Sequence, residues 1–320
     1  MRVVRGAESF PRTAQGSAVT IGAYDGVHRG HRAVIAEVRR LAAERGLVTA
    51  AVTFDRHPAS VVRPESAPRL LTDLEQKLEL LATTGLDHTF VVSFDEVRSK
   101  ESAEDFVTGV LAGSLGARLV VVGEDFHFGH QRRGNVALLR QMGLGLGFDV
   151  IGLGLVDAAG RVAAAESVRV SSTAIRAALV AGDLAAANEA LGRHHEVRGV
   201  VVHGDHRGQG WGYPTANVAA PEEVLVPADG IYAGWYERPD GAVSPAAVSI
   251  GRRPTVHDHQ DTSLLEAHLL DFDGELYGEV ARVRFVARLR GEERYGSVEA
   301  LITHIGRDCY DARRLLTCSF

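Results

Sequence analysis

Two patterns of hydrophobic and polar positions divide the chain. In the first part, short apolar runs rich in β-branched or aromatic residues alternate with segments whose apolar positions recur at helical spacing. The runs predict strands at residues 17–21, 47–54, 88–93, 118–122 and 148–156. The intervening segments predict helices at residues 32–45, 72–84, 103–115 and 135–142. Such β–α alternation is typical of a mainly parallel sheet with helices on both faces.

Local start signals support two of these helices. Thr72 followed by Glu75 matches a capping box, in which each side chain accepts a hydrogen bond from the backbone N–H of the other residue. Ser102 followed by Asp105 offers a similar start. We therefore expect helices to begin directly after Thr72 and Ser102.

The pattern changes after an alanine-rich helical segment at residues 174–192, which we interpret as the join between two domains. Beyond it, short strands separated by Gly, Pro and Asp are predicted at residues 196–203, 231–237, 246–250, 263–270 and 279–289. This spacing favours an antiparallel sandwich or barrel. A last helix is predicted at residues 297–316, with an apolar side made of Leu301, Ile305, Ala312 and Leu315.

The composition is that of an ordinary globular protein. The chain has 320 residues, of which 45% are hydrophobic and 24% charged, which suits two folded domains and argues against wholesale disorder. The net charge of -6 argues against a non-specific nucleic-acid binder. The start of the chain lacks a signal-peptide core, and no apolar run approaches ~18 residues. We expect a cytoplasmic protein without a nucleic-acid or membrane partner.

Cysteine and lysine usage narrows the chemistry. Cys309 and Cys318 fit no C-x-x-C pattern, and we interpret them as reduced structural thiols. Lys77 and Lys100 are the only lysines, so nearly all positive charge is carried by arginine. The sequence G-x-x-x-x-G-K-[ST] does not occur, which excludes a standard P-loop kinase.

Polar clusters follow three of the predicted parallel strands. They occupy residues 22–31, 54–58 and 123–129. In a sheet of this kind, ligands bind beyond the carboxyl ends of the strands. We therefore expect the three clusters to contribute to one site.

The first cluster has the features of a phosphate-binding turn. Glycines at 22, 26 and 30 allow a ligand to approach the backbone closely, and the helix start that follows favours a negative charge. His28 and His31 lie at the mouth of that helix and can donate hydrogen bonds to a polyphosphate. The alternative is an ordinary tight turn with two exposed histidines.

Motifs spread over the chain carry a family resemblance. Residues 22–31 resemble the signature of the nucleotidylyl transferases. T-F-D-R-H-P, V-G-E-D-F-H-F-G and V-S-S-T-A-I-R follow at residues 53–58, 122–129 and 170–176. The order of these blocks resembles that in the prokaryotic bifunctional riboflavin kinase/FMN adenylyltransferases, also called FAD synthetases.

The resemblance implies two domains with two reactions. Residues 1–186 would form a Rossmann-like nucleotidylyl transferase domain that transfers AMP from ATP to FMN, giving FAD and pyrophosphate. Residues 187–320 would form an antiparallel β-barrel flavokinase domain with a C-terminal helix, which phosphorylates riboflavin with ATP to FMN.

In the first domain, the resemblance implies that His28, His31 and Arg176 act on the triphosphate. The other implied ATP- and phosphate-binding residues are Gly22, Asp25, Gly26, Gly30, Ser171, Ser172 and Thr173. The implied flavin-binding residues are His57, Pro58, Asp125, Phe126 and Phe128. Two alternatives stay open. Residues 171–176 also fit a plain N-cap of a helix beginning near Ala174, with a surface arginine, and the two phenylalanines also fit a packed loop hinge.

In the second domain, residues 202–217 form a Gly-rich stretch that ends in P-T-A-N and resembles the flavokinase signature. The glycines expected to wrap around phosphates include Gly204, Gly208 and Gly210. Thr215 and Asn217 are two apart, so on an extended segment both face the same side. Their neutral oxygens suit Mg²⁺, which takes its remaining ligands from ATP and water. The alternative is an ordinary turn.

Glu266 is the implied general base of the kinase reaction. It lies in L-L-E-A-H-L-L-D-F-D-G, where alternation places Glu266 and His268 on one face of a strand and Leu265, Ala267 and Leu269 on the other. An ordinary glutamate has a pKa of about 4.3, so it takes the hydroxyl proton only as the transition state develops. The alternative is a solvated glutamate on an exposed strand face.

Some positions depart from the family pattern. Tyr24 stands where Phe is usual, Arg252 and Arg253 precede Pro-Thr, and His304 replaces a frequent Gln. The histidine-rich residues 256–260 are expected to form a mobile surface loop.

A metal-binding alternative concerns the first domain. The residues that can be considered as zinc ligands are His28, His31, His127, His130 and Asp125. No cysteine joins them, and the sequence gives no closed four-ligand set.

Taken with the resemblance, the sequence predicts a bifunctional flavin-cofactor enzyme. Both steps would use ATP as co-substrate and Mg²⁺, with no tightly held organic cofactor. The expected partners are riboflavin, FMN, FAD and ATP, and the chain is expected to be a monomer or a weak homo-oligomer. One alternative is that only one half is catalytic and the other is a flavin- or nucleotide-binding regulatory module. Another is a non-enzymatic protein that responds to flavin.

Overall fold

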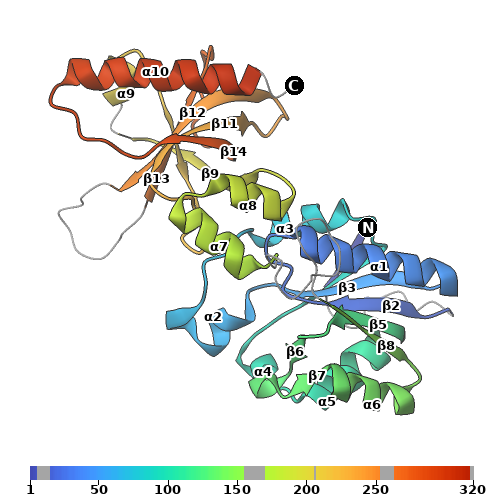
Figure 1. Ribbon diagram of the computed structural model, residues 1–320. Helices are drawn as coiled ribbons and strands as arrows, with labels where there is room; N and C mark the ends of the chain where they lie inside the picture. The colour runs from blue at the N-terminus through green and yellow to red at the C-terminus, as the bar shows by residue number, and fades with distance from the viewer. Residues whose placement is uncertain (6–14, 155–169, 205–206, 253–262, 318–320) are drawn as a thin grey trace. The chain divides into compact units, whose positions relative to one another are not determined.

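The computed structural model describes residues 1–5, 15–154, 170–204, 207–252 and 263–317, in two compact units, residues 1–172 and 173–320 (Figure 1). The domain boundary expected at residue 186 falls inside helix α8 (Leu184–Leu191) and stays a prediction. The last residues of the strand predicted at 148–156, Arg253, the loop at 256–260 and Cys318 lie outside the described residues.

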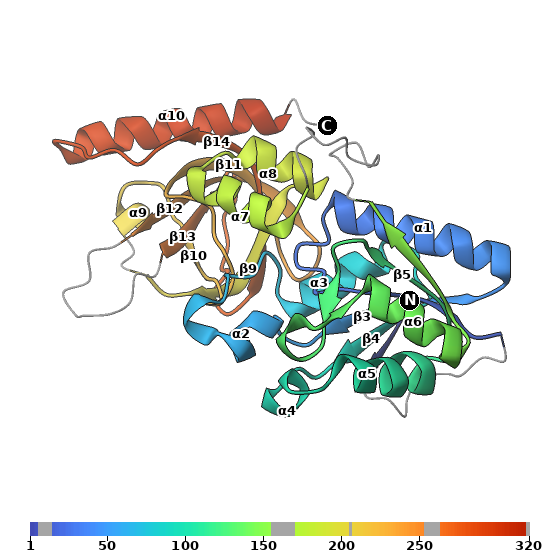
Figure 2. The ribbon, with the colours of Figure 1, turned by 60° about the horizontal axis from the view of Figure 1, so that its bottom comes forward.

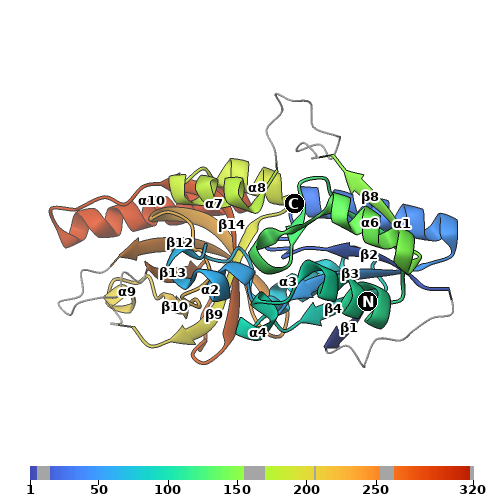
Figure 3. The same cartoon turned by 90° about the horizontal axis from the view of Figure 1, so that it is seen from below.

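The first unit contains a six-stranded parallel sheet in the order β1-β4-β3-β2-β5-β8. Its strands are β1 (Arg2–Arg5), β2 (Ser17–Ile21), β3 (Val48–Phe54), β4 (His88–Val92), β5 (Ala117–Gly123) and β8 (Asp149–Leu153). Figure 3 shows β2, β3, β4 and β1 succeeding one another. The strand order reverses at β2, which is where such sheets bind ligands. The predicted parallel sheet is confirmed, with β1 as an additional strand.

Alternation along the central strands explains why helices cover both faces of the sheet. Ala18 and Leu119 pack against α1 (Arg29–Arg45), whereas Val19 and Val120 belong to the core cluster on the other face. Residues of the π-helical segment η3 (Val107–Ser114) and of α6 (Val136–Leu146) complete that second cluster. Strands β2 and β5 therefore each contribute to two separate cores.

Of the two helix starts predicted from capping signals, the structure confirms the one at Ser102. Ser102 caps α5 (Ala103–Phe106), because its hydroxyl accepts from the Asp105 N–H. The capping box at Thr72 is wrong: Asp73 caps α3 (Leu74–Ala82), and Thr72 instead accepts from the Gly26 N–H at 3.1 Å. Thr72 is therefore tied to the turn after β2, a long-range contact that local pattern does not reveal.

Shorter elements surround the edge of the sheet. They are α2 (Pro58–Val62), η2 (Pro64–Ser66), α4 (Glu96–Ser99), β6 (His127–Phe128), η4 (His130–Arg132) and β7 (Gly134–Asn135). The helix predicted at residues 103–115 is α5 followed directly by η3.

The second unit is a closed antiparallel barrel in the order β10-β13-β12-β11-β14-β9. Its strands are β9 (His195–Val202), β10 (Ala216–Ala219), β11 (Gly230–Glu237), β12 (Val243–Arg252), β13 (Ser263–Leu269) and β14 (Val280–Arg290). Alternate residues such as Tyr232, Val248 and Phe285 are completely buried. The barrel expectation is confirmed, and β10 is an additional, short strand.

Helix α10 (Val298–Thr317) runs beside the barrel (Figure 2). Ala312 and Leu316 are buried with Ala233 and Leu270 of the barrel. The prediction that Leu315 lies on the apolar side is wrong, because its exposure is 37%. The buried stripe passes through Leu316, one helical turn after Ala312.

The helical segment predicted at residues 174–192 is two helices, α7 (Ser172–Ala181) and α8. Gly182 has a positive φ of 77°, and Asp183 caps α8 through the Ala186 N–H, so the chain turns between them. The Asn188 side chain in α8 accepts from the His195 N–H and donates to the Phe285 carbonyl. These bonds fix α8 to the barrel. A further short helix, α9 (Arg207–Gly210), precedes β10.

Candidate active sites

The turn between β2 and α1 places two histidines at a helix start. His28 is the N-cap of α1, and its Nδ1 accepts a hydrogen bond of 3.3 Å from the His31 N–H. The turn before it contains the left-handed residues Tyr24 (φ 50°) and Val27 (φ 38°) in addition to Gly26 (φ 81°). Left-handed Val in particular is strained, so other contacts must hold this turn in place.

The two imidazole rings stack with a centroid distance of 3.6 Å and an interplanar angle of 17°. Burial, followed by the proximity of His28 and Lys77, holds the pKa of His31 well below its ordinary value. His31 is therefore neutral at neutral pH. A neutral imidazole still carries one N–H, so this arrangement suits hydrogen bonding to an anion rather than ion pairing.

Asp25 holds the turn from inside. Only 4% of the residue is exposed. Its carboxylate accepts hydrogen bonds from the N–H groups of Leu71 and Thr72 at 2.9 and 3.1 Å. The Ser172 hydroxyl donates to the Asp25 carbonyl at 2.9 Å. The described partners of Asp25 are thus protein groups, and its predicted contact with phosphate stays a prediction.

The glycines of the turn differ in their surroundings. A Cβ on Gly22 would come within 3.2 Å of the Tyr24 ring, so the space there is limited. Gly30 is buried in the first turn of α1. The tight approach at Gly22 is thus to a side chain of the protein itself, whether or not a ligand also uses it.

The predicted flavin-binding residues lie on two loops. His57 caps α2 through its Nδ1, which accepts from the Ala59 N–H at 3.1 Å, and Pro58 opens that helix. Phe126 and Phe128 stack on each other at 5.4 Å and pack against the core of the first unit. Asp125, beside them, is exposed. This packing agrees with the hinge alternative, and a role in flavin binding stays a prediction.

The predicted phosphate-binding block at residues 170–176 contains the boundary between the two units. Helix α7 begins at Ser172, so Ser171 precedes the helix and Thr173 lies within its first turn. Ser171 and Ser172 belong to the first unit, whereas Thr173 and Arg176 belong to the second. Arg176 is half-buried. The helix therefore starts two residues earlier than the predicted start near Ala174.

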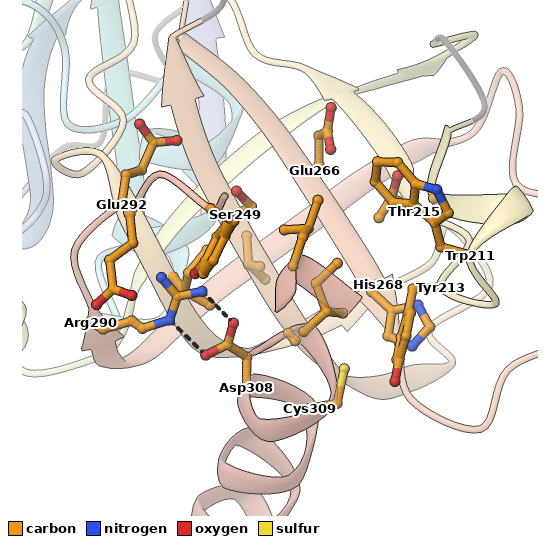
Figure 4. A pocket seen from close by; sticks show the side chains of 18 of the residues that line it. Trp211, Tyr213, Thr215, Ser249, Glu266, His268, Arg290, Glu292, Asp308 and Cys309 are labelled. Carbon is orange, nitrogen blue, oxygen red and sulfur yellow. Dashed lines mark hydrogen bonds and ion pairs between the residues drawn. The ribbon is translucent and has the colours of Figure 1, made fainter. Parts of the chain in front are cut away.

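The second unit has a cavity of about 470 Å³ between one face of the barrel and α10 (Figure 4). Glu266 and His268 reach it from β13, and Asp308 and Cys309 from α10. The remaining polar and aromatic residues that line it include Trp211, Tyr213, Thr215, Asn217, Ser249, Arg290, Glu292, Glu293 and Tyr295. The volume is in the usual range for small-ligand sites.

Strand register assembles the polar centre of this cavity. Glu266 is paired with Asn217 of β10 on one side and with Ser249 of β12 on the other. Directly opposed residues in antiparallel strands have neighbouring side chains on the same face. The predicted Asn217–Glu266 combination is therefore brought together, and Leu265, Ala267 and Leu269 are buried on the opposite face, as predicted.

Two of the three predicted phosphate-loop glycines have no room for a side chain. A Cβ on Gly204 would overlap the side-chain amide of Asn217, and one on Gly208 would overlap the Tyr213 carbonyl. A Cβ on Gly210 meets nothing within 4 Å among the described residues. Positions 204 and 208 therefore leave no room for a larger residue, whereas position 210 does.

Aromatic and charged side chains surround the polar centre. His268 Nδ1 lies 2.7 Å from the Pro214 carbonyl, and the Tyr213 ring meets the His268 ring edge-on at 5.4 Å. Arg290 makes two hydrogen bonds to Asp308, at 2.9 and 2.6 Å, which tie α10 to β14 (Figure 4). This bidentate pair fixes the helix that forms one wall.

Sequence reasoning missed several of these residues. Ser249 lies two positions from Ala247 on the same alternating face of β12, but no motif marks it. Arg290 and Asp308 are 18 positions apart, so only the folded chain reveals their pairing. The signal available for Ser249 was a polar residue at an alternate position of an apolar strand.

Among residues 1–5, 15–154, 170–204, 207–252 and 263–317, no three His, Cys, Asp or Glu side chains gather as a possible metal-binding group. Within the same ranges, no helix has the length and apolar character needed to cross a bilayer.

Both units resemble known protein families. A sequence model of the FAD synthetase family matches residues 10–174, and one of the riboflavin kinase family matches residues 191–316. A crystal structure described as a macrolide-efflux protein from Streptococcus pneumoniae is 25% identical and has a TM-score of 0.84. It covers 97% of this chain and 98% of its own.

Two curated relatives extend the match over nearly the whole chain. Both are named bifunctional riboflavin kinase/FMN adenylyltransferase. The relative from Pseudomonas fluorescens is 38% identical over 98% of this chain and 98% of its own length. The relative from Escherichia coli strain K12 is 36% identical over 98% of this chain and 97% of its own length. The chain therefore belongs to the family of bifunctional riboflavin kinase/FMN adenylyltransferases.

Proposed function

We propose that the chain phosphorylates riboflavin with ATP to FMN in its second unit and adenylates FMN with ATP to FAD and pyrophosphate in its first. The observation that carries the kinase half is the pairing of Glu266 with Asn217 and Ser249 inside the cavity beside α10. The adenylylation half is supported by the stacked His28–His31 pair at the start of α1.

In the kinase reaction, Glu266 is the proposed general base. Its carboxylate accepts the proton of the ribityl 5′-hydroxyl as that oxygen bonds to the γ-phosphorus of ATP and ADP leaves. A proton transfer of this kind requires the base to be well oriented toward the hydroxyl. The fixed register of β13 between β10 and β12 supplies that orientation.

The donors at the cavity fit Mg²⁺, and Thr215 and Asn217 are the residues we propose to hold it. Both line the cavity and offer neutral oxygen atoms, and Glu266 adds a carboxylate nearby. Mg²⁺ is commonly bound by one or two protein groups together with substrate phosphates. When bound, the ion would neutralise charge on the transferring phosphoryl group.

In the adenylylation reaction, a phosphate oxygen of FMN attacks the α-phosphorus of ATP and pyrophosphate leaves. This transfer depends on alignment and charge stabilisation more than on a protein nucleophile. We propose that His28 and His31 donate hydrogen bonds to the phosphates, and that Gly22, Gly26 and Gly30 allow the backbone to approach them. Arg176, Ser171, Ser172 and Thr173 are proposed to complete the pyrophosphate contacts.

The test is an incubation of the full chain with riboflavin, ATP and Mg²⁺, followed by chromatographic separation of FMN and FAD. We expect FMN to form first and FAD to follow with release of pyrophosphate. Supplied FMN should give FAD directly. FMN accumulation without FAD, or FAD formation only from supplied FMN, would show that one unit binds ligands without catalysis.

A further inference from the structure

One buried lysine joins the two loops that carry the proposed site of the first unit. Lys77 lies in α3, and only 7% of the residue is exposed. Its Nζ donates to the Phe54 carbonyl at 2.8 Å and to the Ala23 carbonyl at 3.3 Å. Phe54 ends β3 and leads to His57, whereas Ala23 belongs to the turn that leads to His28.

The turn that Lys77 contacts is the strained one. Ala23 is followed by Tyr24, whose left-handed backbone is unfavourable for a residue with a side chain. The Ala23 carbonyl also accepts from the Thr53 hydroxyl at 3.2 Å, so two donors fix it. Such conformations persist only where surrounding contacts determine them. Lys77 is therefore one of the groups that keeps the histidine-bearing turn in its observed shape.

Charged and titratable groups face the ammonium from three neighbouring elements. Asp25 lies in the turn after β2, Asp55 follows β3, and His31 lies on α1 with His28 stacked on it. Burial lowers the pKa of Lys77 to about 8, and the two carboxylates oppose that shift. In return, the ammonium helps to keep His31 neutral.

Lysine at this position is unusual for the chain. Lys and Arg together number 35, and only two of them are Lys. An ammonium is a compact group with three donors on a flexible stem, whereas a guanidinium is a flat fork. Two carbonyls from different loops, met inside a packed core, suit the compact group.

We propose that Lys77 is a positioning residue for adenylyl transfer, which holds the loops after β2 and β3 in their active arrangement. The proposal rests on the proposed function of the first unit. Lys77 acts through Ala23, Phe54 and His31 and does not itself need to touch a substrate.

The test compares Lys77→Met, Lys77→Arg and the matched control Lys100→Met. Lys100 is exposed and is the C-cap of α4. FAD formation from supplied FMN and FMN formation from riboflavin are measured for each variant of the full chain. Lys77→Met is expected to lower kcat/KM for FAD formation about 10- to 100-fold, because misplacing reacting groups by about 1 Å costs that much. The rate of FMN formation should be unchanged in Lys77→Met, and both rates should be unchanged in Lys100→Met.

Lys77→Arg keeps a charge and donors, so it should recover part of the lost FAD formation. Equal losses in Lys77→Met and Lys77→Arg, accompanied by unfolding of the first unit at the assay temperature, would reduce Lys77 to a structural role and overturn the proposal. A folded Lys77→Met protein with the FAD formation of the unaltered chain would also overturn it.

The pH dependence of the unaltered chain gives a test that needs no variant. FAD formation should fall relative to FMN formation as pH rises through about 8, since the Lys77 ammonium then loses its proton. Because the folded pKa lies below the unfolded value of 10.5, stability contributed by this group rises with pH across the same interval. Unfolding therefore does not explain a decrease in FAD formation over this interval. In Lys77→Arg, the decrease in FAD formation should occur at higher pH.

The assays distinguish failure of the proposed function from failure of the proposed role of Lys77. If the unaltered chain makes no FAD from FMN and ATP, the proposed function of the first unit is wrong and the role of Lys77 falls with it. If the unaltered chain makes FAD but the ratio of FAD to FMN formation is flat from pH 7 to 9, only the role of Lys77 is wrong.

Discussion

The two proposed sites are built in different ways on one chain. In the first unit, His28 and His57 are helix caps on turns that follow parallel strands, and contacts from Asp25 and Lys77 hold those turns. In the second unit, Asn217, Glu266 and Ser249 lie side by side because three antiparallel strands are in register.

The two sites are therefore sensitive to different kinds of substitution. A turn with left-handed residues depends on a few side-chain bonds from outside it, so single changes at a distance can displace the reacting groups. A register is maintained by many backbone bonds, so the kinase centre should resist such changes. It should respond chiefly to loss of a reacting group or to a new atom inside the cavity.

The largest effect is expected for Glu266→Gln, which removes the proposed base without changing size. FMN formation should fall about 10²- to 10⁴-fold, the usual contribution of a general base. FAD formation from supplied FMN should not change, because no residue of the first unit is altered. The exposed Glu222→Gln variant is the control, and both reactions are followed by chromatography. Full kinase activity in Glu266→Gln would remove the proposed base.

The corresponding change in the first unit is His28→Asn. Asparagine is a good N-cap, so α1 keeps its start while the imidazole is lost. FAD formation should fall about 10²- to 10³-fold, as when a charge-stabilising donor is removed elsewhere. The control is His88→Asn. His88 is the first residue of β4, so it lies at the amino end of that strand and not at the carboxyl edge of the sheet. A variant with wild-type FAD formation would show that the cap, not the ring, is what matters.

A smaller effect should follow when an atom is added against Asn217, a side chain that lines the kinase cavity. Gly204→Ala forces the Asn217 amide to move, so FMN formation should fall about 10- to 100-fold. Gly210→Ala should lose less, because its Cβ meets open space among the described residues. Gly296→Ala, also open, serves as the control. Initial rates at saturating ATP separate the three, and equal rates for the 204 and 210 variants would contradict the crowding observed at Gly204.

The last expected effect is on stability rather than on reaction rate, and it concerns the barrel scaffold. His195 is buried, its Nε2 lies 3.1 Å from the Leu225 carbonyl, and burial lowers its pKa to about 4. Between pH 6.5 and 4 the unfolded chain binds a proton that the folded chain does not, so stability falls as pH falls. The loss should reach about 3 kcal/mol. Denaturant unfolding of the second unit checks it, and a similar slope in His195→Gln would assign the loss to another group.

Periodicity was sufficient for most of the fold. The buried runs of β2 and β5 and the alternating strand β13 are recognisable because each follows a single spacing rule. The two-stranded pair of β6 and β7 was not predicted, and one strand of each main sheet was also missed, for different reasons. β1 has four residues and begins and ends with arginine, whereas β10 has four residues, two of them alanine. Their pairing comes from neighbours in the sheet rather than from their own composition.

The site was predictable only where motif residues are local. His28, Asn217 and Glu266 belong to recognisable blocks, and the structure places the last two together. Lys77 and Ser249 matter through contacts with residues far away in sequence, and no local pattern identifies them. Thr72 illustrates the same limit, since its capping signal is overridden by a bond to the turn after β2.

A mixing experiment asks whether the chain holds two independent catalytic centres. Purified Glu266→Gln and His28→Asn proteins are incubated with riboflavin, ATP and Mg²⁺, separately and together, and FAD is quantified. Each alone should yield almost no FAD, whereas the mixture should yield it, because one protein supplies FMN and the other converts it. If the mixture makes no FAD, or if either folded variant has lost both reactions, two independent centres do not exist.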